Sequence, residues 1–229
     1  MINHRRLLGL GLFALAATLA SAQDQTGQPA PSAATPAPEA PTSNAWLLGR
    51  TYGEVGGFLE RLRGLPGSTT AAAPDLAVNL PLGDNFDYSA TTFYEHGTTA
   101  GYRLNEESLG NSLTAYYKFG SIAPFGSVGF GYDWERQTIQ NIPGNYDHLF
   151  VDVAGGFEMP VSDSTSLRLT LANYDSLHKP SERDLRYGLS ANAWLNSVLG
   201  TYAGADYKEA YNGEKSSVIF SAGFRFLFE

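Results

Sequence analysis

Apolar and polar residues alternate along most of the chain after residue 50. In the last fourteen residues, SSVIFSAGFRFLFE, every second position is apolar: Val218, Phe220, Ala222, Phe224, Phe226 and Phe228. The residues between them are mostly smaller or more polar. A period of two predicts a β-strand with one strongly apolar face. The pattern leaves open whether that face turns to a core or to lipid.

Ten segments have this character. Aromatic, β-branched and small residues dominate them, and helical periodicity is absent. They cover 50–62, 75–82, 86–96, 108–119, 124–136, 147–160, 164–174, 185–196, 199–209 and 215–228. We therefore predict an all-β protein of about ten strands, with eight as the alternative count.

The second faces of these segments combine Gly, Ser and Ala with charges of both signs. The acidic members are Glu54, Glu60, Asp87, Glu95, Asp133, Glu135, Asp152, Glu158 and Asp206, and the basic members are Lys118, Arg168, Arg186, Lys208 and Arg225. A soluble sandwich or lipocalin-like barrel would place these charges in water. A membrane barrel would place them in its lumen, paired with one another, and turn the apolar faces to lipid. We predict the second arrangement.

Two features favour the membrane barrel. Aromatic residues gather near strand ends, as girdles at lipid–water boundaries require. Connections also alternate between short (82–85, 120–124, 161–164, 196–198) and mostly longer (97–108, 137–146, 175–184, 211–215). Short periplasmic turns, longer external loops and an even strand count fit a transmembrane antiparallel up-and-down β-barrel with both termini in the periplasm.

The N-terminus predicts export. Arg5 and Arg6 precede the apolar run 7–20, and Ala20-Ser21-Ala22 forms a small-x-small cleavage site. We predict a cleaved signal peptide over 1–22, with a retained membrane anchor as the alternative. The stretch 23–45 is rich in Pro, Ala, Ser and Thr, which predicts a disordered periplasmic linker. The barrel is expected over 46–229.

Charge and composition exclude several function classes. The formal net charge is −8, and loss of the two arginines of the signal segment makes it about −10. Such a surface, without a Lys/Arg cluster, argues against nucleic acid as a partner. The chain has no cysteine, so disulfides, thiolate metal sites and cysteine nucleophiles are excluded. No cofactor or metal is expected.

Three stretches resemble a known family. They are APFGSVGFGYDWE (123–135), HLFVDVAGGFEMPVSDSTSLRL (148–169) and FSAGFRFLF (220–228). They are similar to the small outer-membrane β-barrels of Gram-negative-type bacteria, the OmpA-like transmembrane or opacity-type porin superfamily. The resemblance implies an outer-membrane location among its lipids. It also implies recognition of the last strand by the barrel-assembly machinery, through Phe224, Phe226 and Phe228, although Glu229 follows here.

The expected function is a structural or narrow porin-like barrel with an ion-paired polar lumen and external loops. Its excess of acidic lumen residues predicts a bias toward cations. It is not expected to be an enzyme.

Two alternatives remain. A rim-located protease or lipid-modifying enzyme would draw on His96, Asp147, His148, Ser176, His178 and Asp184. Adjacent strand residues point to opposite faces, however, so Asp147 and His148 are not expected to share a site. An adhesin or binder of an unknown external ligand would use loop residues, among them Asn105, Glu106, Glu107, Tyr146, Lys179 and Arg183.

Overall fold

A computed structural model describes residues 45–62, 69–99, 102–177, 183–210 and 216–228. The predicted signal peptide (1–22) and all of the predicted linker except its last residue lie outside this part of the chain. So do His178, Lys179, Glu229 and the predicted connection 211–215.

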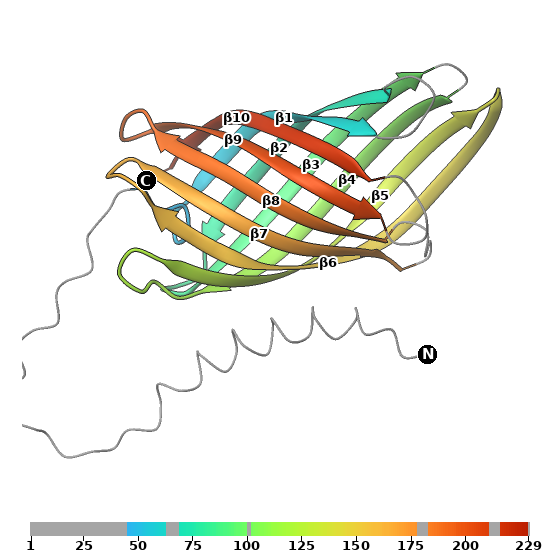
Figure 1. The fold of residues 1–229 in the computed structure, drawn as a ribbon. Coiled ribbons are helices and arrows are strands. Elements are labelled where there is room, and N and C mark those ends of the chain that lie inside the picture. Colours follow the sequence, from blue (N-terminus) through green and yellow to red (C-terminus); the bar gives the residue numbers. More distant parts are fainter. Residues whose placement is uncertain (1–44, 63–68, 100–101, 178–182, 211–215, 229) are drawn as a thin grey trace, which may run out of the picture.

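Ten antiparallel strands form a closed barrel, which confirms the predicted fold class and strand count (Figure 1). The strands are β1 (Tyr52–Leu62), β2 (Thr69–Pro81), β3 (Phe86–Thr99), β4 (Tyr102–Tyr116), β5 (Ala123–Ile139), β6 (Ile142–Pro160), β7 (Thr165–Ser176), β8 (Arg183–Trp194), β9 (Leu199–Ala210) and β10 (Ser217–Leu227). The described part of the chain holds no helix with the length and apolarity that a membrane crossing needs.

Each strand pairs with its neighbours in the chain, and β1 pairs with β10 to close the cylinder. This seam runs from Tyr52 opposite Leu227 to Leu62 opposite Ser217. Glycines face each other at its centre, Gly56 opposite Gly223. The closed pairing leaves no strand without a partner on either side, which a sheet in hydrocarbon requires.

The apolar faces of the strands point out of the barrel. The exposed large side chains include Val55, Leu76, Leu113, Phe130, Leu169, Leu189, Phe220 and Phe224. The buried polar side chains include Glu60, Asp87, Glu95, Asp133, Glu135, Glu158 and Asp184. This orientation is the one predicted for a membrane barrel and the reverse of a soluble one.

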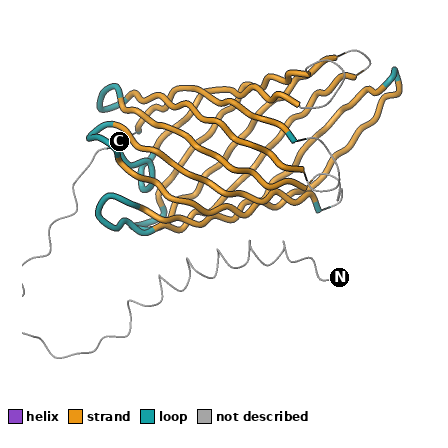
Figure 2. The backbone as a smooth tube through the Cα atoms, viewed as in Figure 1, coloured by secondary structure: helices purple, strands orange, loops and turns teal. Residues whose placement is uncertain are grey.

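The two ends of the barrel differ. At one end the strands are joined by the short turns at 82–85, 117–122, 161–164 and 195–198, and the C-terminus lies at this end (Figures 1 and 2). We call it the turn end. At the opposite, extended end, β5 and β6 are joined only by Gln140 and Asn141, both at positive φ (50° and 69°). Such a two-residue turn matches the twist of a hairpin.

Two of the predicted loops at the extended end, 97–108 and 137–146, are therefore wrong in extent. Most of 97–108 belongs to β3 and β4, and most of 137–146 belongs to β5 and β6. β2 likewise begins at Thr69, six residues before the predicted start at 75. These extensions have no sustained alternation of large apolar and polar residues, so the period-two pattern does not predict them as strands. Backbone pairing nevertheless continues through them.

Candidate functional site: the charged lumen and its mouth

Residues 45–50, which we call the mouth segment, enter the barrel at the turn end before β1 begins. Ala45, Trp46, Leu47 and Leu48 are all buried. Trp46 and Leu48 form one apolar cluster with side chains of β4 and β5: Tyr116, Ala123 and Phe125. The sequence predicts only that this stretch lies at the junction of linker and barrel, and its position inside the barrel was not predicted.

Two buried carboxylates hold the backbone of the mouth segment. Glu158 accepts from the amides of Leu47 at 2.6 Å (Oε1) and Leu48 at 3.4 Å (Oε2). Asp87 accepts from the amide of Gly49 at 2.9 Å through Oδ2. Glu158 is 0% exposed and Asp87 is 2% exposed. These charge-assisted bonds compensate part of the cost of burying both acids and fix the segment across the lumen.

The turn that carries the segment into β1 depends on Gly49. Its φ of 82° lies in the left-handed region, where glycine alone pays no steric penalty. The next residue, Arg50, accepts a hydrogen bond on its carbonyl from Asn79 Nδ2 at 2.8 Å. Its guanidinium lies over the Trp194 ring at 5.5 Å.

Lys118 lies at the same mouth, two residues beyond the end of β4. Its ammonium lies 5.5 Å from the centre of the Trp46 ring and 5.6 Å from that of Tyr116. Partial burial lowers the pKa of Lys118, while Glu158 and Asp87 act in the opposite direction. The mouth thus combines apolar packing with balanced charge.

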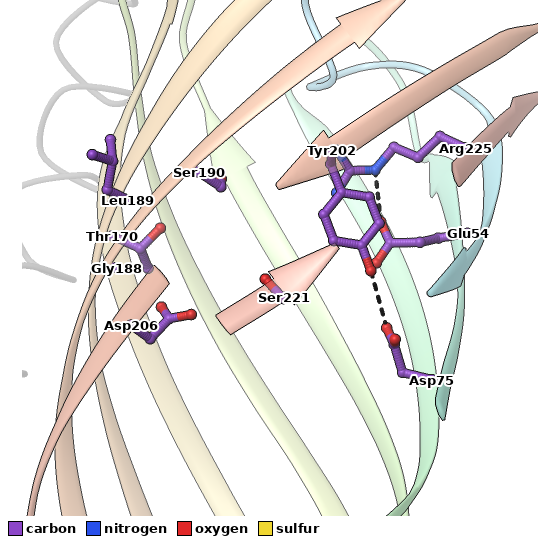
Figure 3. Close-up of a pocket in the computed structure, with 10 residues that line it drawn as sticks. All are labelled: Glu54, Asp75, Thr170, Gly188, Leu189, Ser190, Tyr202, Asp206, Ser221 and Arg225. Atoms are coloured by element: carbon purple, nitrogen blue, oxygen red, sulfur yellow. Dashed lines mark hydrogen bonds and ion pairs between the residues drawn. The ribbon is translucent and has the colours of Figure 1, made fainter. Parts of the chain in front are cut away.

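The lumen also holds a chamber of about 280 Å³, lined by residues of β1, β2 and β7 to β10 (Figure 3). Arg225 of β10 donates to Glu54 Oε2 of β1 at 2.6 Å. The same guanidinium bonds Asn192 and lies over the Tyr202 ring at 4.3 Å. Arg225 therefore braces the wall of the chamber through three different strands.

The rest of the chamber is acidic and hydroxylated. Asp75 and Asp206 line it from β2 and β9, with Thr170, Ser190 and Ser221 around them. Asp75 accepts a long hydrogen bond from the Tyr202 hydroxyl at 3.5 Å, and its other oxygen is buried without a partner among the described residues. Within that part of the chain, no basic side chain pairs with Asp75, Asp152 or Asp206. The middle of the lumen is therefore negative.

Toward the extended end, Arg186 and Lys208 pair with inward acids. Arg186 donates two hydrogen bonds to Asp184, from Nε to Oδ1 at 2.7 Å and from Nη2 to Oδ2 at 3.2 Å. Lys208 lies between Glu60 (3.6 Å) and Asp184 (3.7 Å). Ser217 donates to Glu60 at 2.5 Å. Glu95, Glu106 and Glu135 lie in one paired row across β3, β4 and β5, so three carboxyl groups are neighbours in this part of the barrel.

The rim residues considered for catalysis fall on different surfaces. His148 is buried in the lumen, 3.3 Å from Asp133, and the Tyr174 hydroxyl lies 3.1 Å from His148 and donates to Asp133 at 2.6 Å. Asp147 is exposed on the outside. His96 is also exposed on the outer face, whereas Ser176 and Asp184 are buried inside. The structure thus separates Asp147 from His148, as alternation requires.

The predicted lumen charges lie on the inner phase of their strands or, for Lys118, at the mouth. This holds for Glu54, Asp87, Glu95, Asp133, Glu135, Asp152, Glu158, Arg168, Arg186, Asp206, Lys208 and Arg225. Arg168 lies over the Phe125 ring at 4.0 Å. The proposed assembly residues Phe224, Phe226 and Phe228 are exposed on the outer face.

Several inward ionisable side chains were not predicted to lie in the lumen. Asp75, Glu106, Asp184 and His148 all point inward. They were placed at a strand start or in connections, where the inward phase could not be assigned. Across the described residues, no group of three or more His, Cys, Asp or Glu is arranged to hold a metal ion.

Comparison with known proteins yields structural matches alone. No family model and no curated protein matches the sequence. The translocator domain of the autotransporter NalP from Neisseria meningitidis matches 98% of this chain and 96% of its own, with 12% identity and a TM-score of 0.49. The attachment invasion locus protein Ail of Yersinia pestis matches 79% and 99%, with 6% identity and a TM-score of 0.40.

A third match is the N-terminal β-barrel domain of Pseudomonas aeruginosa OprF. It covers 78% of this chain and 99% of that domain, with 9% identity and a TM-score of 0.40. All three are outer-membrane barrel proteins, the class that the sequence resemblance names. At these scores the likeness adds nothing on function, and the closed barrel is established by its own strand pairing.

Proposed function

We propose that this chain is an outer-membrane β-barrel with a narrow, cation-preferring lumen that the mouth segment keeps closed at the turn end. The observation that carries the proposal is the capture of the Leu47, Leu48 and Gly49 amides by Glu158 and Asp87 inside the barrel. Ten strands enclose far less space than the sixteen to eighteen of aqueous porins. Any conductance is accordingly small.

The charge of the lumen supports the preference for cations. Asp75, Asp152 and Asp206 lie along its middle without a basic partner among the described residues. Carboxylates on a low-dielectric wall raise the local concentration of cations and repel anions. Arg225, the basic side chain that lines the middle chamber, is already committed to Glu54 and Asn192.

The outward apolar band supports the location. Phe130 is 63% exposed, and Val55, Leu113 and Phe220 also face outward. Such a band is stable only against hydrocarbon or another apolar surface. Outer-membrane lipid and, during biogenesis, the barrel-assembly machinery are the partners that this proposal requires.

A planar-bilayer recording of refolded protein tests the proposal. The wild-type barrel should show rare, small, cation-selective openings. Trp46→Ala/Leu48→Ala removes the packed side chains of the mouth segment. Each buried apolar side chain contributes about 1.5–3 kcal/mol, so the open fraction should rise at least about tenfold.

The matched control is Leu195→Ala/Val198→Ala, which trims two exposed apolar residues at the same end, outside the lumen. It should leave the recordings unchanged. Large anion-selective steps, or equal effects of the two double variants, would contradict the proposal.

We also propose that the barrel has no catalytic activity. Asp147 and His148 lie on opposite faces, and the Tyr174 hydroxyl donates to Asp133 Oδ2, the same oxygen that lies 3.3 Å from His148. Hydrolysis assays on lipid A and on basic peptides test this directly. Turnover that is lost in His148→Gln but kept in His96→Gln would reinstate the enzyme hypothesis.

A further inference from the structure

A groove of about 540 Å³ lies on the outer surface of the barrel, near the extended end of β3, β4 and β5. It is lined by Tyr94, Asn105, Glu107, Trp134 and Arg136, which we call the rim groove. None of these side chains enters the lumen, because all lie on the outward phase of their strands. The rim groove is therefore distinct from the lumen.

Strand register builds the groove from two rows. In one row Glu107 is flanked by Tyr94 and Trp134, and in the next Asn105 is flanked by His96 and Arg136. The floor is polar, and the walls are aromatic or basic. The wall strands β3 and β5 are two strand spacings apart, about 10 Å. That width admits one sugar ring between the Tyr94 and Trp134 side chains.

The groove lies at the border of the apolar band. Directly below it on the outer face are Leu109 and Leu113 of β4 and Phe130 of β5, all exposed. Once this band is in hydrocarbon, the next residues along the strands are at the level of lipid headgroups. Tyr and Trp are enriched at that level, with the ring against apolar groups and the polar atom in water.

The polar groups of the groove are arranged for a ligand. Asn105 Oδ1 accepts from the Tyr94 hydroxyl at 3.2 Å and lies 2.8 Å from His96 Nδ1. These contacts orient the amide and leave its NH₂ as a donor. Within the described residues, no ion pair engages Arg136 or Glu107. A guanidinium in this state matches the geometry of a phosphate oxygen pair.

We propose that the rim groove binds the sugar–phosphate headgroup of a phosphorylated glycolipid in the outer leaflet. The sugar ring lies between Tyr94 and Trp134, its hydroxyls meet Glu107 and Asn105, and its phosphate meets Arg136. The lipid chains continue down the apolar band past Leu109. This inference rests on the proposed outer-membrane location and is independent of conduction through the lumen.

Native mass spectrometry of the barrel, folded in a detergent without sugar, tests the proposal. The probes are bisphosphorylated lipid A, dephosphorylated lipid A and phosphatidylglycerol. The wild type should bind bisphosphorylated lipid A most tightly. Arg136→Gln should weaken that binding at least about tenfold, the equivalent of one charge-assisted hydrogen bond. It should leave binding of dephosphorylated lipid A unchanged, whereas Trp134→Leu should weaken both lipid A forms.

Arg103→Gln is the matched control, because Arg103 is an exposed outward arginine of β4 that lies outside the groove. It removes the same charge and should leave all three affinities unchanged. Equal losses in the two arginine variants, equal affinity for phosphatidylglycerol and lipid A, or a second copy of the chain in place of lipid would each overturn the proposal. Binding is read in micelles, so a barrel that binds lipid A without conducting refutes only the pore function.

Discussion

The two ends of the lumen neutralise their buried acids in different ways. At the turn end, Glu158 and Asp87 accept hydrogen bonds from backbone amides of the mouth segment. Toward the extended end, Asp184 and Glu60 meet the side chains of Arg186 and Lys208. The backbone amides belong to the mouth segment, which precedes β1 and which we propose can leave the lumen, whereas Arg186 and Lys208 belong to the wall strands β8 and β9.

Because of this difference, we expect the contacts at one end to determine the stability of the barrel and those at the other end to keep the mouth of the lumen closed. Loss of Arg186 or Lys208 should destabilise the barrel, because it leaves a buried acid of the wall without its partner. Loss of an amide contact should open the mouth and leave the wall intact. Substitutions at each end can therefore test the two functions one at a time.

The largest expected effect follows Arg186→Met. Removing one partner of a buried pair is strongly destabilising; because Arg186 is about a third exposed, we expect about 2–3 kcal/mol. Urea unfolding in vesicles, read by the heat-modifiable gel shift, measures the loss. The control is Arg183→Met on the same strand, whose pair with Asp175 faces outward at 28% and 32% exposure and should cost less than about 1 kcal/mol. Equal losses of unfolding free energy in the two variants would contradict the expected difference between the inward and the outward ion pair.

A smaller effect is expected from Glu158→Gln. The amide keeps the volume of the side chain but replaces one acceptor oxygen with a donor, so one amide of the mouth segment loses its partner. The closed state should lose about 1–2 kcal/mol. Hydrogen exchange at Leu47 and Leu48 should accelerate accordingly.

The same strand supplies the control for Glu158→Gln. Asp152 also points inward from β6 but lies six residues before Glu158, farther from the turn end of the strand. Asp152→Asn should leave exchange at 45–50 unchanged. Acceleration by both variants would mean that the mouth responds to total lumen charge and not to the specific hydrogen bonds.

The smallest effect concerns backbone conformation at Gly49. Gly49→Ala places a Cβ at φ 82°, which costs about 1 kcal/mol, and the methyl group meets the Tyr116 hydroxyl at 2.7 Å. Acrylamide quenching of Trp46, in a background without Trp134 and Trp194, should rise several-fold. Gly83→Ala is the control, with φ 113° and nothing within 4 Å of the added Cβ. It carries the backbone strain without touching the mouth and should leave quenching unchanged.

Alternation predicted the barrel because each spanning strand has one apolar face and one polar face. Val128, Phe130, Tyr132 and Trp134 share an outward face on β5, and the inward charges fall on the opposite phase. Gly131 shows the same logic at close range, since a Cβ there would overlap the ring of Phe150 on the neighbouring strand. The strands could thus be predicted from the sequence wherever one face contacts lipid and the other faces the polar lumen.

The position of the mouth segment inside the barrel could not be predicted in the same way. Trp46, Leu47 and Leu48 are consecutive apolar residues, and a run of three has neither strand nor helix period. The signal available was that such a run directly follows a stretch without large apolar groups and directly precedes a strand. Its partners, Glu158 and Asp87, are more than thirty residues away in the sequence, so only the three-dimensional structure could join them.

The seam between β1 and β10 joins the first strand of the barrel to the last. Its side-chain bonds link residues 157 and 171 positions apart, from Glu60 to Ser217 and from Glu54 to Arg225. Contacts at such sequence separation form late, because most of the chain must be ordered before they can be made. A chain that lacks its final strand would keep two unsatisfied edges in the bilayer. Completion of the cylinder therefore requires an ordered β10.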